Sequence, residues 1–194
     1  MASRLMAALA ALGSLGSLFL ASRPVQAAPA ELPPAELPPE IPPAELPRVT
    51  SGRLSPGDVL AYAREADPEG WMPAAELLAF VQVESSFRTN AIRWEPRLGE
   101  ASYGLMQVLE STARDRGLVG DPRAMFEPVT GLRMGILQAR WSWEFLRRKL
   151  GRDPTEAEWV GSYNAGVGNI LRGWFPQGYI RNWQLARDRW AVGA

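Results

Sequence analysis

A glutamate at the end of an apolar run is the residue in this chain whose position most clearly suggests chemistry. Glu84 lies three residues after Val81 and seven after Leu77. At helical spacing these residues share one face, so the carboxyl group belongs to the stripe that faces the core. Burial and a position near a helix C-terminus both disfavour the charged form and raise the pKa of a carboxyl group. Such a group can donate a proton near neutral pH, unless the side chain simply extends into solvent where the helix ends.

The residue composition excludes several other kinds of active site. The chain of 194 residues contains no Cys and no His. Cysteine–histidine pairs, the Ser-His-Asp triad and nearly every common zinc site therefore lack the residues that build them. The formal net charge is zero, which argues against a nucleic-acid partner because such proteins need a strongly basic surface. No cofactor or metal is expected, and a proton-transferring carboxyl is the leading candidate.

The N-terminal region differs in composition from the rest of the chain. Residues 1–27 combine Arg4, an uncharged stretch rich in Leu and Ala, and small residues before a cleavage point after Ala27, as in a secretory signal peptide. The alternative is an uncleaved membrane anchor, because the apolar stretch is near the short limit for a span. With cleavage, no stable membrane span is expected, and the mature protein is expected to be periplasmic or secreted.

Residues 28–53 form a Pro-rich linker in which the motif Ala-Glu-Leu-Pro-Pro recurs. Proline at this density opposes both helical and sheet hydrogen bonding and favours an extended polyproline II conformation. The linker is expected to be a passive spacer, with a docking peptide for a partner protein as the alternative.

Residues 54–194 are expected to form a single all-α domain. Proline and capping residues open several segments with helical spacing, and glycines close them. No segment shows a convincing two-residue period, so an open α/β sheet is not expected. Residues 90–103 lack a clear period, and a long irregular loop in a compact domain is often functional. The expected helices span residues 55–66, 73–84, 110–116, 128–150 and 178–190, with another opening at 153–156.

Three short motifs follow one another in the order E-S-S-F, Y-G-L-M-Q-V and Y-N-A-G-V-G. They occupy residues 84–87, 103–108 and 163–168. In this order they resemble the catalytic domain of the soluble-lytic-transglycosylase (SLT) family, which has a goose-lysozyme-like helical fold. Each motif alone is weak, but the three together behind a secretion signal are specific. The resemblance spans roughly residues 70–185 and implies a lysozyme-like domain.

The resemblance also implies roles for residues in each motif. Glu84 would be the sole catalytic acid and base. Gln107, Tyr163 and Asn164 would line the cleft and position the acetamido sugars or the carboxyl group. Gly104 would allow a close backbone approach. The other residues expected to bind substrate are Met106, which is either cleft floor or core, Tyr103, Ser102 and, as the counterpart of a late tyrosine of the family, Tyr179.

The segment between the first two motifs departs from the family pattern. It is longer than the resemblance leads us to expect, and Leu98 occupies the place of a hydroxyl residue, for which Ser102 or another loop residue would have to substitute. The longer segment also carries Glu95 and Glu100. Each is expected to be either a solvated loop charge or a second carboxylate at the cleft. A second carboxylate near Glu84 would favour a mechanism that uses water.

The substrate implied by the resemblance is the glycan strand of peptidoglycan. Glu84 would protonate the β-1,4 bond between N-acetylmuramic acid and N-acetylglucosamine and then deprotonate the C6 hydroxyl that attacks C1. One carboxyl suffices because intramolecular attack replaces a recruited water. Two alternatives stay open: a muramidase-type hydrolase on the same fold, and a non-catalytic wall-binding or assembly protein. The linker also suits an enzyme that serves a secretion or conjugation machine or other envelope machinery.

Overall fold

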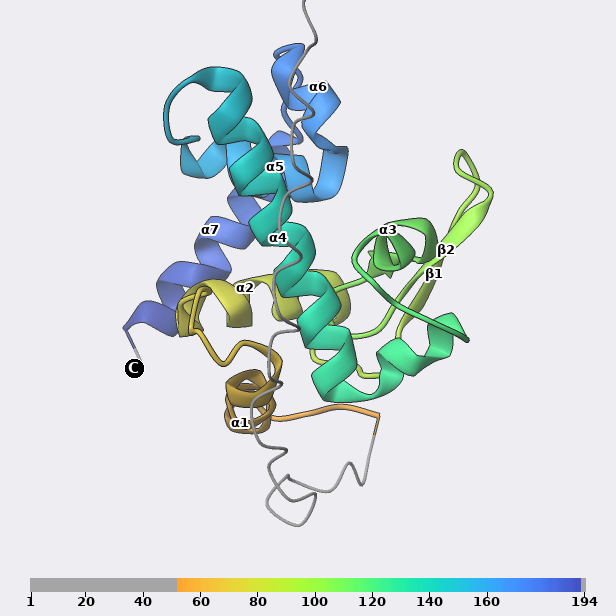
Figure 1. Ribbon diagram of the computed structural model, residues 1–194. Helices are drawn as coiled ribbons and strands as arrows, with labels where there is room; N and C mark the ends of the chain where they lie inside the picture. The colour runs from red at the N-terminus through yellow and green to blue at the C-terminus, as the bar shows by residue number, and fades with distance from the viewer. Residues whose placement is uncertain (1–51, 193–194) are drawn as a thin grey trace, which may run out of the picture. The chain divides into compact units, whose positions relative to one another are not determined.

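The computed structural model describes residues 52–192, and Figure 1 shows how their helices and strands are arranged. The predicted signal peptide, residues 1–27, and the linker up to residue 51 lie outside the described residues and stay predictions. Gly52 and Arg53, which the sequence assigned to the linker, pair with the segment that follows the second helix. Among the described residues, none of the helices combines the length and the apolar composition needed to span a bilayer.

The described residues are mostly helical, as predicted, with one small sheet. The long helices follow the predicted segments closely, whereas two short helical elements, η2 and α6, were not predicted. The helical elements are α1 (Pro56–Ala66), α2 (Ala74–Ser85), α3 (Glu110–Asp115), η2 (Pro122–Phe126), α4 (Pro128–Leu150), α5 (Glu156–Ala165), α6 (Val167–Leu171) and α7 (Gln177–Ala191). The strands are β1 (Ile92–Glu95), β2 (Glu100–Tyr103) and β3 (Val108–Leu109).

Local side-chain chemistry sets the helix boundaries. At the start of α1, the Ser55 hydroxyl accepts a hydrogen bond from the backbone N–H of Asp58, and the Asp58 carboxylate accepts one from the backbone N–H of Ser55. Thr155 and Glu158 form the same reciprocal capping box at the start of α5. Helix α4 ends at Gly151, whose φ of +69° is the left-handed conformation that glycine adopts without steric cost. These are the signals from which the boundaries were predicted.

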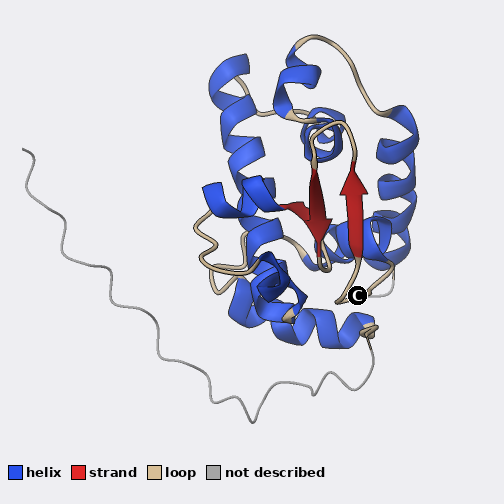
Figure 2. Cartoon of the chain, turned by 90° about the vertical axis from the view of Figure 1, so that its right-hand side faces the viewer, coloured by secondary structure: helices blue, strands red, loops and turns tan. Residues whose placement is uncertain are grey.

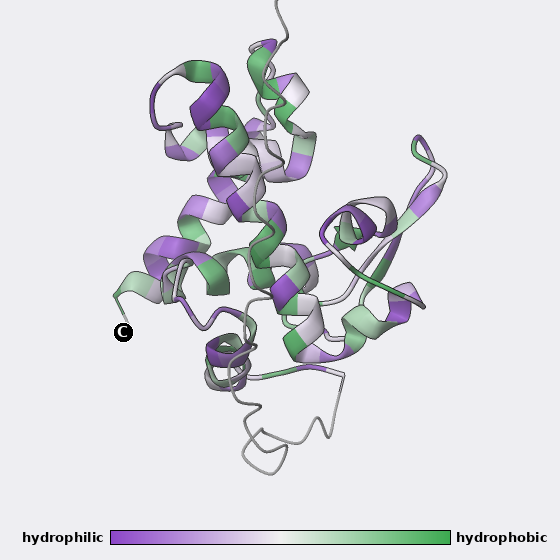
Figure 3. Cartoon of the chain, in the orientation of Figure 1, coloured by the Kyte–Doolittle hydropathy of each residue, from purple (hydrophilic) through white to green (hydrophobic). Residues whose placement is uncertain are grey.

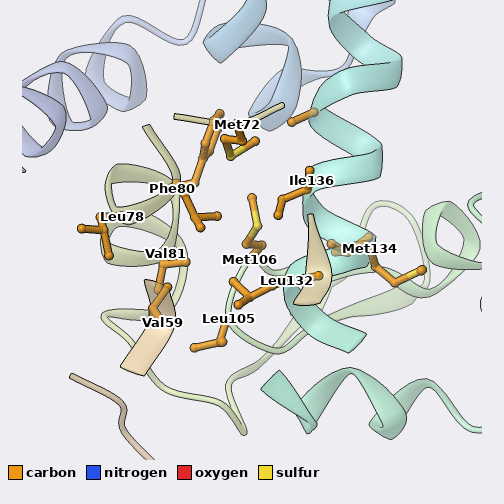
Figure 4. Packing of buried hydrophobic residues seen from close by; sticks show 14 of the residues in the cluster. Val59, Met72, Leu78, Phe80, Val81, Leu105, Met106, Leu132, Met134 and Ile136 are labelled. Atoms are coloured by element: carbon orange, nitrogen blue, oxygen red, sulfur yellow. The ribbon is translucent and has the colours of Figure 1, made fainter. Parts of the chain in front are cut away.

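Helix α4 forms one long side of the hydrophobic core. Its buried face packs against α1 and α5, and Trp159 of α5 donates a hydrogen bond from Nε1 to the Ala139 carbonyl at 2.9 Å. Figure 3 shows hydrophobic and hydrophilic residues alternating along α4, as a helix between core and solvent requires. In Figure 4 the side chains of Leu132 and Ile136 extend from this helix toward residues of α2.

Helix α7 packs along α2 through one stripe of aromatic side chains. Tyr179, Trp183 and Trp190 recur at spacings of four and seven residues. The fully buried ring of Trp183 lies 5.3 Å from that of Phe80, measured between centroids. Trp190 donates from Nε1 to the Gln82 side-chain oxygen at 3.0 Å. These contacts hold the C-terminal end of α2 in place, which is where the candidate acid lies.

The sheet corrects the prediction of an irregular loop at residues 90–103. This segment forms the antiparallel hairpin of β1 and β2, and β3 adds to the far side of β2 in the order β1-β2-β3. Figure 2 shows the strands among the helices, and Figure 1 shows the hairpin extending away from them. Because most of β1 is exposed on both faces, its side chains do not alternate between apolar and polar. The strand therefore has no two-residue period that would have predicted it.

Candidate active site

The end of α2 presents Glu84 at the surface of a cleft. The helix stops at Ser85 because the next two residues, Ser86 and Phe87, take left-handed backbone angles with φ of 51° and 67°. Such angles are costly for residues other than glycine. Tertiary contacts hold them: the Phe87 carbonyl accepts a hydrogen bond from the backbone N–H of Leu54 at 2.9 Å. Glu84 therefore lies in the last turn, with its backbone in a packed helix.

The Glu84 carboxyl lies where α2, α7 and the sheet meet. Its Oε1 accepts a hydrogen bond of 2.5 Å from the phenolic hydroxyl of Tyr179 on α7. The adjoining cleft has a volume of about 490 Å³. Its lining residues come from the helices, the hairpin and the motif loops: Glu84, Arg93, Glu95, Leu98, Ser102, Gln107, Leu109, Tyr163 and Asn164.

Burial raises the pKa of Glu84 from its ordinary value of 4.5 to about 7. The Tyr179 hydrogen bond and the positive charge of Arg93 act in the opposite direction, because both favour the carboxylate, whereas the charge of Glu95 raises the pKa further. Loss of solvation is the largest of these effects, so the acid is about half protonated near neutral pH. Burial and the neighbouring carboxyl also raise the pKa of Tyr179 well above its usual value, so its hydroxyl stays a hydrogen-bond donor.

The hairpin forms the wall of the cleft that faces Glu84. In the register of the sheet, Arg93 of β1 lies opposite Ser102 of β2, and Glu95 lies two residues farther along the same strand. Side chains two apart in a strand share one face, and these three all line the cleft. Arg93 Nε donates to Glu95 Oε1 at 2.5 Å, which makes a close ion pair on this wall.

Gln107 lies at the floor of the cleft and joins the hairpin to the body of the domain. Its backbone is left-handed, with φ of 48°. Its side-chain amide nitrogen donates to the carbonyls of Ala91 and Gly104 at 3.0 and 2.9 Å, and its oxygen accepts from the Ser102 hydroxyl at 3.1 Å. The sequence predicted a residue that positions sugars or the acid. In the structure its amide hydrogens hold the backbone around the cleft, and its role toward sugars or the acid stays a prediction.

Tyr163 and Asn164 line the cleft from the last turns of α5, as the sequence led us to expect. The Tyr163 hydroxyl donates to the backbone carbonyl of Met106 at 2.8 Å, and its ring lies 4.8 Å from that of Phe80. Burial raises the pKa of Tyr163 well above its usual value, so it too remains a donor. Asn164 is exposed at the cleft, where an amide can form hydrogen bonds with a ligand.

Two residues expected at the cleft lie elsewhere. Met106 has no exposed surface, and Figure 4 shows it in the core between α2 and α4. A Cβ at Gly135 of α4 would lie 2.3 Å from the Met106 sulfur, so glycine makes room for this side chain. The structure therefore favours the core over the cleft floor. Tyr103 neighbours Ser102 in β2 and points to the opposite face, where its ring lies 6.0 Å from that of Phe126.

Glu95 and Glu100, the two glutamates between the first two motifs, lie in different environments. Glu95 lines the cleft, whereas Glu100 accepts hydrogen bonds from the backbone N–H and the hydroxyl of Ser111, both at 2.8 Å. Glu100 thus caps the first turn of α3 and does not line the cleft. Gly104 allows the close approach predicted for it, since a Cβ there would lie 2.2 Å from the Met125 carbonyl oxygen.

Sequence reasoning missed Arg93 and Leu109 as cleft residues. The strand register pairs both residues with Ser102 and so places them on its face of the sheet. The sequence analysis could not use this register because it did not predict the strands. Within residues 52–192, no group of three or more acidic side chains is placed to hold a metal ion.

The comparisons with known proteins agree with this fold. Among solved structures, the 70 kDa soluble lytic transglycosylase from Escherichia coli superimposes with a TM-score of 0.53 at 19% sequence identity. The match covers 69% of this chain and 24% of that chain, so this chain spans about a quarter of that protein's length. No curated protein matches the sequence.

The fold and the family model together place this domain in the class of transglycosylase SLT domains. The family model described as the transglycosylase SLT domain matches residues 61–181, and the chain belongs to this family. The family predicted from the three motifs is therefore confirmed.

Proposed function

We propose that the protein cleaves the β-1,4 bond between N-acetylmuramic acid and N-acetylglucosamine in peptidoglycan and leaves a 1,6-anhydro-N-acetylmuramic acid end. The observation that carries this proposal is the state of Glu84. Its pKa is raised to about 7 by burial, and it is held by Tyr179 at the edge of a cleft large enough for sugar rings. A carboxyl group with this pKa can both donate and accept a proton near neutral pH.

In the first step, the Glu84 carboxyl gives its proton to the glycosidic oxygen, and the bond from that oxygen to C1 of the muramic sugar breaks. In the second step, the Glu84 carboxylate takes the proton from the C6 hydroxyl of the same sugar, and the C6 oxygen bonds to C1. The proton given in the first step is thus recovered in the second. Tyr179 donates a hydrogen bond throughout, which stabilises the carboxylate formed between the steps.

The proposal includes the parts of the chain that the structure does not describe. Residues 1–27 would direct the protein to the periplasm or out of the cell, and the Pro-rich linker would carry the domain to peptidoglycan or to a secretion, conjugation or other envelope machine. Fractionation of cells that express the chain would test the location. A protein found only in the cytoplasm would contradict this part of the proposal.

A wall-binding protein without activity is the alternative, and the burial of the Glu84 carboxyl argues against it. Burying a carboxyl group costs folding free energy, and a surface that only binds sugars has no need of that cost.

The deciding experiment is mass spectrometry of the sugars released from purified peptidoglycan by the parent chain and by Glu84→Gln. The parent should release products one water lighter than hydrolysis products, and the variant should release none, because an amide cannot supply the proton. The variant should still bind peptidoglycan in a pull-down. A variant that retains substantial lytic activity would remove Glu84 from the mechanism.

A further inference from the structure

The cleft contains a second carboxylate that the proposed reaction does not use. Glu95 and Glu84 line the same cleft, one from the hairpin and one from α2. The charge of Glu95 acts on the Glu84 carboxyl, so the two groups are within electrostatic range of each other. Each has its own partner, Arg93 for Glu95 and Tyr179 for Glu84. They are therefore two separately held carboxyl groups of one cleft.

We infer that Glu95 activates water at this cleft and gives the protein a hydrolytic activity beside the transglycosylase reaction. This inference rests on the proposed function for the role of Glu84 and adds a second fate for the same cleaved bond. The products of hydrolysis carry a reducing N-acetylmuramic acid end in place of the anhydro ring.

The environment of Glu95 suits a general base. Its side chain is 29% exposed, so water reaches it from solvent. Arg93 donates to Oε1, which orients the carboxylate and leaves Oε2 to accept a proton. The position in β1 also fixes its direction, because Arg93 is held opposite Ser102 in the sheet register and Glu95 shares their face.

Glu84 and Glu95 line one cleft from different elements, so a water held by Glu95 can reach a sugar bond that Glu84 protonates. Glycosidases that use water in one step keep their acid and base about 6.5–9.5 Å apart so that the sugar and the water fit between them. A cleft of about 490 Å³ between the walls has room for both, since one water occupies about 30 Å³.

The hydrolytic step balances without any further reactant. Glu95 takes one proton from water, and the water oxygen bonds to C1 of the muramic sugar. The bond from C1 to the glycosidic oxygen breaks, and that oxygen takes the proton of Glu84. Exchange with solvent then returns Glu84 to its protonated form and Glu95 to its carboxylate.

The test is digestion of purified peptidoglycan in water labelled with oxygen-18, with separate quantification of the two product classes by mass spectrometry. Hydrolysis places the label at C1, and anhydro formation places none. The variant Glu95→Gln keeps the size of the side chain and an oxygen for Arg93 but cannot take a proton. We expect it to lower the ratio of labelled to anhydro products about 100-fold, a loss typical for a general base.

Glu100→Gln is the matched control, because Glu100 is the cross-strand partner of Glu95 and lies outside the cleft. It should leave the ratio of the two product classes unchanged. The inference is overturned if the parent releases no labelled reducing ends, or if Glu95→Gln leaves the ratio of labelled to anhydro products unchanged. Anhydro products absent from the parent would instead contradict the proposed function, so the two failures are distinguishable.

Discussion

The two walls of the cleft hold the same kind of side chain in opposite ways. On the helical wall, Glu84 is partly buried, has a neutral hydroxyl as its hydrogen-bond partner, and has its pKa raised to about 7 by loss of solvation. On the hairpin wall, Glu95 is partly exposed and paired with Arg93, which is itself 55% exposed. Loss of solvation controls the charge of the first carboxyl, and an ion pair accompanies the second. One residue type thus meets two environments in a single cleft, one that favours the neutral carboxyl and one that supplies an ion-pair partner.

The walls also differ in packing. The helical wall rests on an aromatic cluster in which Phe80 contacts Trp159, Trp183 and Tyr163 with ring centroids 4.8–5.5 Å apart. On the hairpin, Trp94 is 60% exposed. The packed wall holds Glu84 in place and shields it from solvent, whereas the exposed wall leaves Glu95 open to water.

Substitutions on the two walls should differ most in their effect on the free energy of unfolding. Trp183 is fully buried, so Trp183→Ala should lower the free energy of unfolding by about 3–5 kcal/mol through lost contacts and a cavity. Trp94→Ala removes an exposed ring and should change it by less than about 0.5 kcal/mol. Urea unfolding of the full chain measures both values. Similar losses from the two variants would contradict the difference in packing.

A second effect concerns the pH dependence of stability. Because folding raises the pKa of Glu84 from 4.5 to about 7, the folded protein holds a proton that the unfolded chain releases between these values. The free energy of unfolding therefore falls as the pH rises through this window, by up to about 3 kcal/mol. Glu84→Gln removes this loss. Its stability relative to the parent should rise with pH across the window and stay constant above it.

Urea titrations at several pH values on each side of the window measure this relative stability. Glu95→Gln is the control from the other wall, because Glu95 is partly exposed and paired. A Glu84→Gln curve that runs parallel to that of the parent at all pH values would show that the acid is not desolvated in solution.

The smallest expected effect compares one partner from each wall. The Tyr179 hydroxyl and the Arg93 charge both lower the pKa of Glu84, and the hydroxyl has the larger effect. Tyr179→Phe and Arg93→Gln should therefore both raise this pKa, so that activity falls at a higher pH on the alkaline side. Tyr179→Phe should also lower kcat/KM about tenfold, the value of one hydrogen bond to a charged group.

Profiles of kcat/KM against pH for the parent and both variants provide the measurement. A larger alkaline displacement for Arg93→Gln than for Tyr179→Phe would show that the Arg93 charge affects the pKa of Glu84 more than the Tyr179 hydroxyl does. A displacement to lower pH in either variant would contradict the assigned causes.

The sequence predicted the helical wall well because its signals are local. Ser55 and Asp58 mark the start of α1, the bounds of α4 agree with the predicted 128–150, and the burial of Glu84 follows from its spacing to Val81. The contact between Tyr179 and Glu84 spans 95 positions. Only the family resemblance suggested Tyr179 as a site residue, because local spacing carries no information on such distant contacts.

The hairpin wall could not be predicted in the same way. Its strands are short, β1 is mostly exposed, and the two central residues of β2 are both buried, so burial leaves no two-residue period in the sequence. Met106 faces the core and its neighbour Gln107 faces the cleft, and the backbone at Gln107 is left-handed where the two directions diverge. Glutamine rarely adopts that angle, so no rule based on residue type predicts it.

The short pairing at the start of the domain has a mechanical consequence. The Gly52 carbonyl accepts from the backbone N–H of Thr89 at 2.8 Å, and Leu54 donates to Phe87 at 2.9 Å. Tension applied to the chain before residue 52 would reach these two hydrogen bonds before it reached the core. They hold the bend directly after α2, so a pull on the N-terminal segment would act on the end of the helix that carries Glu84.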